Sequence, residues 1–246
     1  EDLALTPDGK YLLATNLNSS VSVIDVATRT RVSTFSVGTN RNAVAVGNDG
    51  DVLVADSSAG LLRRLRLSAA GRLSDLGQTL AVPSAFNVVL APDGRTGVAL
   101  NTAGRRMQSF VLAGMTAAGD QFLPDGSAPV SGVFSPGGER FYVRTMAGTV
   151  TAWSYDPASG QMGAAPLFSI AAGLADAFYG ADQVDVSADG AKLYVTDNAT
   201  VKVYDAVTGE LLGVKGNVAH DYVGVTVARP APSAPAPGSR SSFIAA

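Results

Sequence analysis

The fold of this chain is decided by residues 5–38, which read LTPDGKYLLATNLNSSVSVIDVATRTRVSTFSVG. A Pro-Asp-Gly turn at residues 7–9 is followed by two apolar strands, residues 11–15 and 20–25, with a polar turn between them. Pro and Asp start such a bend and Gly accepts a positive φ, so the pattern predicts antiparallel hairpins. A second copy, VSADGAKLYVTDNATVKVYDAVTGELLGVKG, occupies residues 186–216. One unit cannot bury its own apolar faces, so the repeat predicts stacked all-β units.

The glycine of this turn recurs along the chain. It lies at Gly9, Gly50, Gly94, Gly138 and Gly190, with gaps of 41, 44, 44 and 52 residues. These gaps fit the period of a four-stranded propeller blade, which is about 40 to 50 residues. We therefore expect an all-β β-propeller of four-stranded antiparallel blades, with five full repeats and a partial sixth. The chain should be one domain with units at residues 1–38, 39–82, 83–127, 128–172, 173–217 and 218–246.

Each unit begins with a short strand of small and branched apolar residues, which is typical of a strand packed on both faces. We expect these first strands at Asp2–Leu5, Ala43–Val46, Asn87–Leu90, Gly132–Ser135 and Val184–Ser187. The second strands are expected at Tyr11–Thr15, Val52–Asp56, Thr96–Asn101, Phe141–Thr145 and Leu193–Asp197. The third strands are expected at Ser20–Asp25, Leu61–Leu67, Met107–Leu112, Thr149–Tyr155 and Thr200–Asp205.

The sixth unit is incomplete. Residues 223–230 read VGVTVARP, which predicts another first strand, and a Pro-rich stretch follows at residues 230–237. That stretch is either a flexible linker or an enlarged turn before a second strand at residues 241–245. Five and a half units do not close a ring, so we expect six blades, or seven if upstream residues are missing. The native protein should then be heavier than the 25.0 kDa of this chain.

The composition narrows the chemistry. Apolar residues make up 46% of the chain and charged residues 16%, and there is no cysteine and one histidine, His220. This leaves no disulfide, thiol or cysteine-zinc chemistry, and we expect no metal site. The net charge is -3, and the basic residues are scattered along the chain. Because phosphate binding needs a concentrated basic surface, we expect a protein partner and no nucleic acid. No apolar run is long enough to span a membrane.

The repeat resembles the YVTN family of β-propellers. The residues that carry the resemblance are Leu193–Asp197, which read LYVTD, and Val21–Asp25, which read VSVID. The resemblance implies a bacterial protein that is periplasmic, secreted or on the cell surface. Related propellers include lactonases and the heavy subunits of quinoprotein dehydrogenases.

Loops that share one face of a propeller are the natural place for a site. If the first strand of each blade runs from the top face to the bottom, the blade connections and the second-to-third turns lie at the top. The candidate binding residues there are Arg41, Asn42, Asn87, Arg144, Tyr179, Asp182, His220 and Tyr222. Weak catalytic candidates are His220, Asp221, Asp182 and Tyr179, since a His beside a carboxylate titrates near neutral pH. Adjacent residues on an extended chain point to opposite sides, however, and a lone loop His is often structural.

Other polar and aromatic positions have two interpretations each. The second-to-third turns start at Asn16, Asp56, Asn101, Thr145 and Asp197, which either close the turns or form a ring that binds a cation or a sugar. Trp153 is either packed between blades or a stacking platform. The pairs Arg63-Arg64 and Arg105-Arg106 either cover apolar surface with their stems or contact an acidic partner.

These observations favour a non-enzymatic, extracytoplasmic propeller that serves as a binding or assembly scaffold for a protein or polymer partner, or for a second copy of itself. The alternative is a propeller enzyme of the lactonase or quinoprotein-dehydrogenase type, with its site at the mouth of the top-face channel. A single histidine speaks against the enzyme. The sequence assigns no cofactor.

Overall fold

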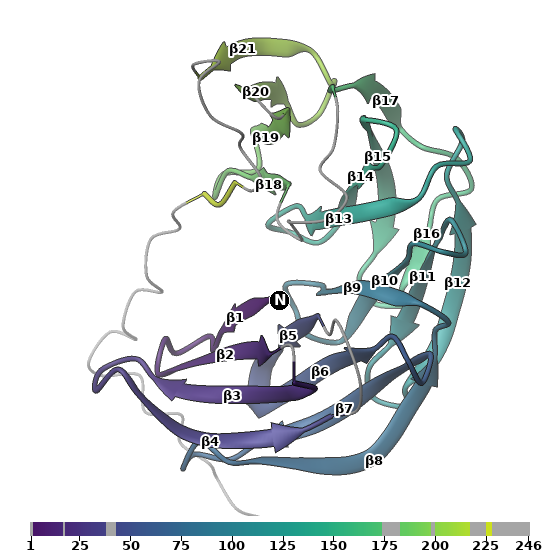
Figure 1. The fold of residues 1–246 in the computed structure, drawn as a ribbon. Helices are drawn as coiled ribbons and strands as arrows, with labels where there is room; N and C mark the ends of the chain where they lie inside the picture. Colours follow the sequence, from purple (N-terminus) through teal and green to yellow (C-terminus); the bar gives the residue numbers. More distant parts are fainter. Residues whose placement is uncertain are drawn as a thin grey trace, which may run out of the picture.

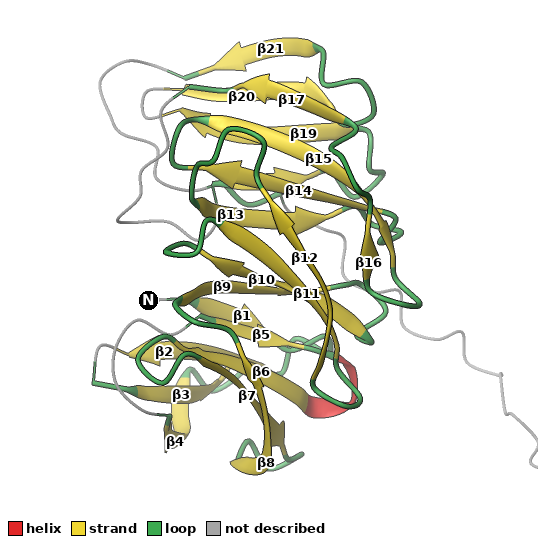
Figure 2. Cartoon of the chain, turned by 90° about the vertical axis from the view of Figure 1, so that its right-hand side faces the viewer, coloured by secondary structure: helices red, strands yellow, loops and turns green. Residues whose placement is uncertain are grey.

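The computed structural model describes residues 2–16, 18–37, 43–173, 183–197, 200–216 and 225–227. These residues form five antiparallel sheets, which follow one another in chain order around an arc (Figure 1). Seen from the side, the strands of successive sheets lie in layers (Figure 2). Each sheet is one blade, and the predicted all-β β-propeller is confirmed.

The first three blades follow the predicted order of strands. Blade 1 contains β1 (Leu3–Leu5), β2 (Tyr11–Asn16), β3 (Ser20–Asp25) and β4 (Thr30–Ser36). Blade 2 contains β5 (Val44–Val46), β6 (Asp51–Asp56), β7 (Leu61–Leu67) and β8 (Leu73–Ala81). Blade 3 contains β9 (Ala85–Leu90), β10 (Thr96–Asn101), β11 (Arg106–Val111) and β12 (Thr116–Phe122).

The last two blades differ from each other in the fourth strand. Blade 4 contains β13 (Pro129–Phe134), β14 (Arg140–Thr145), β15 (Thr149–Asp156), β16 (Gln161–Met162) and β17 (Phe168–Ala171). Blade 5 contains β18 (Val184–Val186), β19 (Lys192–Asp197), β20 (Thr200–Asp205) and β21 (Leu211–Lys215). In blade 4 both β16 and β17 pair with β15, so the outer strand is split in two.

The first turn of each blade is stabilised by its own side chains. The carboxylate of Asp8 accepts hydrogen bonds from the hydroxyl of Thr6 and from the backbone N–H of Lys10. Asp189 makes the same bonds with Ser187 and Ala191 in the last copy. The hydroxyl hydrogen bond lowers the pKa of Asp8 and of Asp189. The first turns therefore form for local reasons that the sequence displays.

One first turn departs from the others. Residues Asn48–Gly50 form a short 3-10 helix, in which Asp49 has a φ of 59°. A groove of 640 Å³ opens here between blades 1 and 2, lined on one side by Pro7 and Tyr11. The predicted hairpin is confirmed, because β5 and β6 on either side of this turn pair antiparallel. Its tip is a single 3-10 turn, in which Asp49 adopts a left-handed conformation that Asp tolerates better than most residues.

The core consists of apolar clusters between successive blades. The second and third strands of each blade contribute most of the buried residues, and each of the four clusters joins two neighbouring blades. Trp153 is 2% exposed in the cluster between blades 3 and 4, and its indole N–H donates to the Thr151 hydroxyl at 2.9 Å. The packing interpretation of Trp153 is therefore confirmed.

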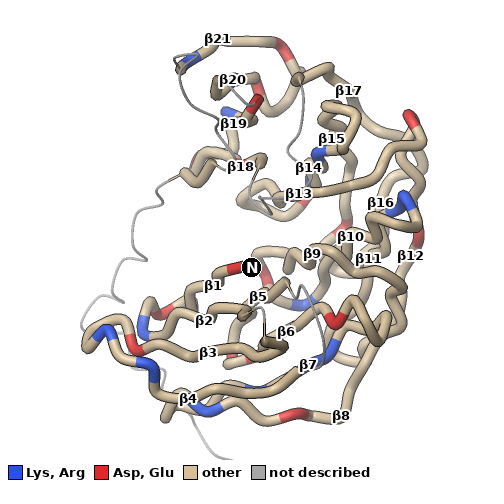
Figure 3. Tube along the Cα trace, in the orientation of Figure 1, with Lys and Arg blue, Asp and Glu red and all other residues tan. Residues whose placement is uncertain are grey.

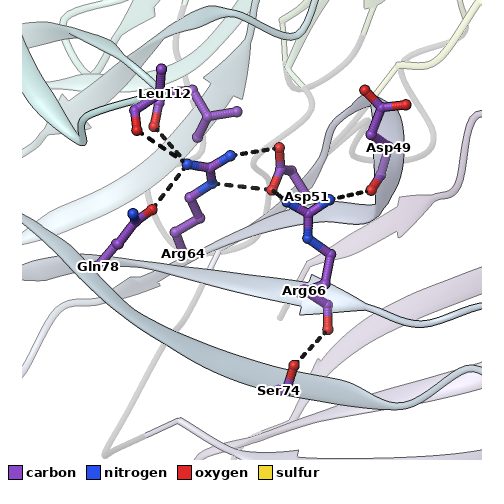
Figure 4. Close-up of polar contacts among 8 residues, drawn as sticks. Asp49, Asp51, Arg64, Arg66, Ser74, Gln78 and Leu112 are labelled. Carbon is purple, nitrogen blue, oxygen red and sulfur yellow. Dashed lines mark hydrogen bonds and ion pairs between the residues drawn. The ribbon is translucent and has the colours of Figure 1, made fainter.

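Polar ties cross each of these interfaces at the bottom. In every case a side chain of one blade donates to a backbone carbonyl in the third-to-fourth turn of the next blade. The pairs are Tyr11 with Ala69, Arg64 with Leu112, Thr96 with Pro157, and Tyr142 with Ala206. Figure 4 shows the Arg64 tie, with Asp51 holding the guanidinium. These ties fix the rotation of each blade against the next.

The predicted sixth unit is described only at residues 225–227. The structure assigns no strand to these three residues. The rest of the first strand expected at residues 223–230 lies outside the described residues, so that strand stays a prediction. Its ladder partner would have to be the second strand expected at residues 241–245, which lies outside the described residues. The backbone N–H of Val227 nevertheless donates a hydrogen bond to the carboxylate of Asp185 in blade 5. Residues 225–227 therefore lie beside the inner strand β18.

Candidate functional site: the central channel

The inner strands of all five blades line one cavity. Its volume is 210 Å³, and residues 225–226 complete its wall. The lining residues are Asp2, Leu3, Val44, Asn87, Val88, Val89, Gly132, Val133, Val184, Asp185, Val225 and Thr226. The wall is apolar apart from two carboxylates, an amide and a hydroxyl. A small cavity with few polar groups selects a small ligand and fixes its orientation.

The two carboxylates, Asp2 and Asp185, have the same hydrogen bonds. In Asp2, Oδ1 accepts the N–H of Leu3 at 2.8 Å and Oδ2 accepts the N–H of Val44 at 2.9 Å. In Asp185, Oδ1 accepts the N–H of Val186 at 2.8 Å and Oδ2 accepts that of Val227 at 2.7 Å. Each carboxylate therefore ties the inner strand of its own blade to the inner segment of the next.

Burial of the Asp2 carboxylate changes its pKa. Desolvation of its carboxylate raises the pKa of Asp2, although the hydrogen bonds from Val44 and Leu3 act in the opposite direction. A carboxylate with a raised pKa accepts a proton more readily at neutral pH than an exposed one does. Asp2 is therefore a candidate proton acceptor in the channel wall.

Neutral polar side chains make similar ties. The hydroxyl of Ser131 in blade 4 accepts the backbone N–H of Gln183 at 3.0 Å, and both residues are buried. Asn87 in blade 3 is also buried and lines the cavity. The polar groups of the channel therefore belong to the inner strands, which are held firmly by their neighbours.

The structure places two of the predicted binding residues. Asn87 is in the channel wall, as described above. Arg144 is fully buried in β14, where its guanidinium donates to the carbonyl oxygens of Gly148 at 3.4 Å and Gly173 at 2.8 Å. Burial lowers the pKa of Arg144 to about 10, against the attraction of Asp197. Arg144 is not among the residues that line the channel cavity.

The other predicted site residues lie outside the described residues. They are Arg41, Asn42, Tyr179, Asp182, His220, Asp221 and Tyr222. Their arrangement stays a prediction.

The ring of turn residues at the top is occupied by local bonds. Each member bonds within its own hairpin, which supports the interpretation that they close the turns. The bonds join Asn16 with Ser20, Asp56 with Ala59, Asn101 with Gly104, Thr145 with Thr149, and Asp197 with Lys202. Within the described parts of the chain, no group of three or more His, Asp or Glu side chains could hold a metal ion.

Three of the four arginines in the two predicted pairs lie beside carboxylates. Arg63 pairs with Asp56 at 3.2 Å, and Arg64 and Arg66 both pair with Asp51. In the second pair, Arg106 pairs with Asp120 at 3.2 Å, whereas Arg105 donates to the backbone carbonyl of Gly126 at 3.3 Å. Figure 3 shows basic and acidic residues interspersed along the described trace. Arg63, Arg64 and Arg66 are thus engaged in ion pairs within the protein. These contacts do not support binding of an acidic partner or a nucleic acid at these positions.

Sequence reasoning missed the carboxylates of the channel. Asp2 was assigned only to a strand, and Asp185 was read as one more residue of an inner strand. The available signal was a charged residue inside a short apolar strand. An acidic side chain is almost never fully buried unless it has a hydrogen-bond or ion-pair partner or a function, so such a residue indicates a candidate site.

Comparison with known proteins places the fold in a family. The family described as "Lactonase, 7-bladed beta-propeller" matches residues 3–209. The chain belongs to this family. No curated protein matches the chain at a significant level. None of the described residues form a helix long and apolar enough to cross a membrane.

Solved structures share the lactonase-family fold. A protein of unknown function from Desulfotomaculum acetoxidans is 24% identical with a TM-score of 0.80, covering 93% of this chain and 75% of that one. A candidate 6-phosphogluconolactonase from Bacteroides uniformis is 22% identical with a TM-score of 0.69, covering 88% of this chain and 71% of that one. At these identities the likeness concerns the fold alone.

Proposed function

We propose that this protein hydrolyses a small, uncharged lactone in the central channel. The observation that carries the proposal is that Asp2 and Asp185 line one cavity formed by the inner strands. Membership of the lactonase family supports it, as does the likeness in fold to the candidate 6-phosphogluconolactonase. The sequence alone favoured a binding scaffold and gave an enzyme as the alternative. With these observations we favour the enzyme hypothesis.

The chemistry needs one proton acceptor and one water molecule. Asp2 takes a proton from the water, whose oxygen attacks the lactone carbonyl carbon. The ring C–O bond then breaks, and the departing alkoxide takes the proton back from the Asp2 carboxyl group, which gives the hydroxy acid and restores the carboxylate. The raised pKa of Asp2 suits it to the first step. Asp185 and Asn87 orient the ring from other blades.

The lining sets the class of substrate. Its described residues include no Lys or Arg, so nothing in the described wall pairs with a phosphate group. The cavity of 210 Å³ also lies below the range of about 300–1,000 Å³ that is typical of larger ligands. Both observations favour an unphosphorylated five- or six-membered lactone.

The test follows hydroxy-acid release from δ-valerolactone and γ-butyrolactone by titration at constant pH. We expect hydrolysis by the wild-type protein, loss of most of the rate in Asp2→Asn, and a smaller loss in Asp185→Asn. The matched control is Glu210→Gln, which removes an exposed carboxylate at a distance from the channel. If wild-type protein with a native circular dichroism spectrum leaves the rate at the level of buffer, this proposal is wrong.

A specific observation favours a second candidate, the extracytoplasmic scaffold. Leu211, Leu212 and Val214 in β21, the outer strand of blade 5, are 51%, 52% and 49% exposed. Exposed large apolar residues are typical of surfaces that meet a partner or another copy. The resemblance to the YVTN family supports a location outside the cytoplasm for such a scaffold. Light scattering across a concentration series decides it, since self-assembly would increase the mass and Leu212→Ser with Val214→Ser would abolish the increase.

A further inference from the structure

A second cavity lies on the top face between blades 2 and 3, away from the channel. Its volume is 440 Å³, which is within the usual range of about 300–1,000 Å³ for ligand pockets. It is lined by Pro83, Ser84, Asn101, Ala103, Gly104, Arg106 and Phe122, and we name it the Phe122 cleft. It shares no lining residue with the channel cavity.

The cleft is where one blade breaks the repeat. Arg106 begins the third strand of blade 3 and pairs directly with Phe122 at the end of the fourth. The corresponding pairs in blades 1, 2 and 4 hold small residues at the fourth-strand position, and the outermost pair of blade 5 holds Lys215 there. The pairs in blades 1, 2 and 4 are Ser20 with Ser36, Leu61 with Ala81, and Thr149 with Ala171. Packing of the blades therefore does not require an aromatic residue at position 122.

Phe122 is also unusual in its exposure. It is 65% exposed, although burial of an aromatic ring contributes more than that of most side chains. Such a ring at the rim of a cavity provides a flat apolar face that a ligand can cover. Since Phe122 and Arg106 are directly opposite each other on paired strands, their side chains lie on the same face of the blade.

A positively charged and a negatively charged side chain, Arg106 and Asp120, lie beside the ring of Phe122. Arg106 donates to the carboxylate of Asp120 at 3.2 Å, and Asp120 is two residues from Phe122 on the same strand. The Nε of Arg106 is buried and has no hydrogen-bond partner within the described structure, and the same holds for Oε1 of Gln108. Buried groups of this kind usually bind water or a ligand. Arg106 and Gln108 are two residues apart, so they too share a face.

From these features we propose that the Phe122 cleft binds a neutral carbohydrate. One face of a sugar ring covers Phe122, while its hydroxyls pair with Arg106 and Asp120. A hydroxyl both donates and accepts, which matches a site that offers a guanidinium and a carboxylate side by side. An anion fits less well, because Asp120 already neutralises Arg106.

Saturation-transfer difference NMR with maltotriose, cellotriose and chitotriose tests the proposal. We expect transfer to the ring protons of at least one trisaccharide in the wild-type protein. Phe122→Ala should weaken the affinity about tenfold or more, because the ring supplies the main contact area. Arg106→Gln and Asp120→Asn should each weaken it less. Phe122 is exposed, so its removal should leave the unfolding midpoint unchanged.

Two control variants separate this site from others. Leu76→Ala removes an exposed apolar side chain of β8 and should keep full binding. Asp2→Asn in the channel should also keep it, so failure of the lactone proposal would leave this result intact. Lack of transfer to all three sugars, equal binding by Phe122→Ala, or binding of gluconate alone would each overturn the proposal.

Discussion

The carboxylate of Asp185 accepts a hydrogen bond of 2.7 Å from the backbone N–H of Val227, 42 residues further along the chain. The same separation joins Asp2 to Val44 at the other end of the arc. The described inner strands of neighbouring blades form no backbone hydrogen-bond ladder with each other, and these side-chain hydrogen bonds connect them instead. The channel wall therefore depends on side chains for its continuity.

Asp185→Ala should lower the free energy of unfolding by about 1–3 kcal/mol, because it leaves buried N–H groups without an acceptor. Asp185→Asn keeps one acceptor oxygen but turns an NH2 group toward the other backbone N–H, so it should recover only part of the loss. Urea unfolding followed by circular dichroism measures both values. Asp75→Ala is the control, since Asp75 makes an exposed hydrogen bond with the N–H of Gly77 at 2.7 Å and a partly exposed ion pair of 3.9 Å with Arg63. Equal losses in the alanine variants at 185 and 75 would contradict this account of the tie.

The sequence predicted the blades well because their turns form locally. The expected strand Thr96–Asn101 is β10, and the expected strand Leu61–Leu67 is β7. The first strand of blade 4 begins at Pro129, three residues before the expected Gly132, because it continues through an irregularity between Pro129 and Ser131. Such irregularities leave no mark in an alternating apolar pattern.

The candidate sites were harder to predict than the fold. Asn87 was selected from its place in a blade connection and lies in the channel wall. The carboxylates of Asp2 and Asp185 were missed because the repeat aligns strands and turns, whereas the cavity is made where strands of different blades converge. Phe122 was missed because a fourth strand of any composition fits the pattern. Contacts between blades are not encoded by local spacing.

The bottom ties differ in strength, and the tyrosines allow a direct comparison. The hydroxyl of Tyr142 donates to the carbonyl of Ala206 at 2.8 Å, whereas that of Tyr155 reaches the carbonyl of Gly97 only at 3.4 Å. Tyr142→Phe should therefore cost about 1 kcal/mol, close to the net value of a buried hydrogen bond. Tyr155→Phe should cost less. Thermal and urea unfolding of the two variants give the comparison, and a larger loss at position 155 would refute it.

The raised pKa of Asp2 makes stability depend on pH. The folded state holds the Asp2 proton more tightly than the unfolded state does, since burial raises its pKa above 3.8. Its contribution is complete below pH 3.8 and is lost as the pH rises through the higher folded value. The stability of wild type relative to Asp2→Asn should thus fall with rising pH in that window. Urea unfolding at a series of pH values measures it.

Asp8 provides the control of opposite sign for this titration. The hydrogen bond from Thr6 lowers the pKa of Asp8, so its contribution is present above pH 3.8 and is lost as the pH falls through the lower folded value. Wild type relative to Asp8→Asn should therefore gain stability as the pH rises. Slopes of the same sign for both aspartates would rule out burial as the cause at Asp2.

Gly132 in β13 lies against the ring of Phe141 in the neighbouring strand β14 of blade 4, and this contact carries the last prediction. A methyl group added at Gly132 would meet the ring of Phe141, which is fully buried in the core between blades 3 and 4. A buried ring cannot move aside without disturbing its neighbours, so Gly132→Ala should cost about 1–3 kcal/mol of unfolding free energy. Gly213→Ala is the matched control in a strand, because nothing lies within 4 Å of the added methyl group. Urea unfolding should place Gly213→Ala close to wild type or above it, since alanine restricts the unfolded chain. If both variants lose the same stability, the cost comes from the strand backbone and the close approach of Phe141 does not explain it.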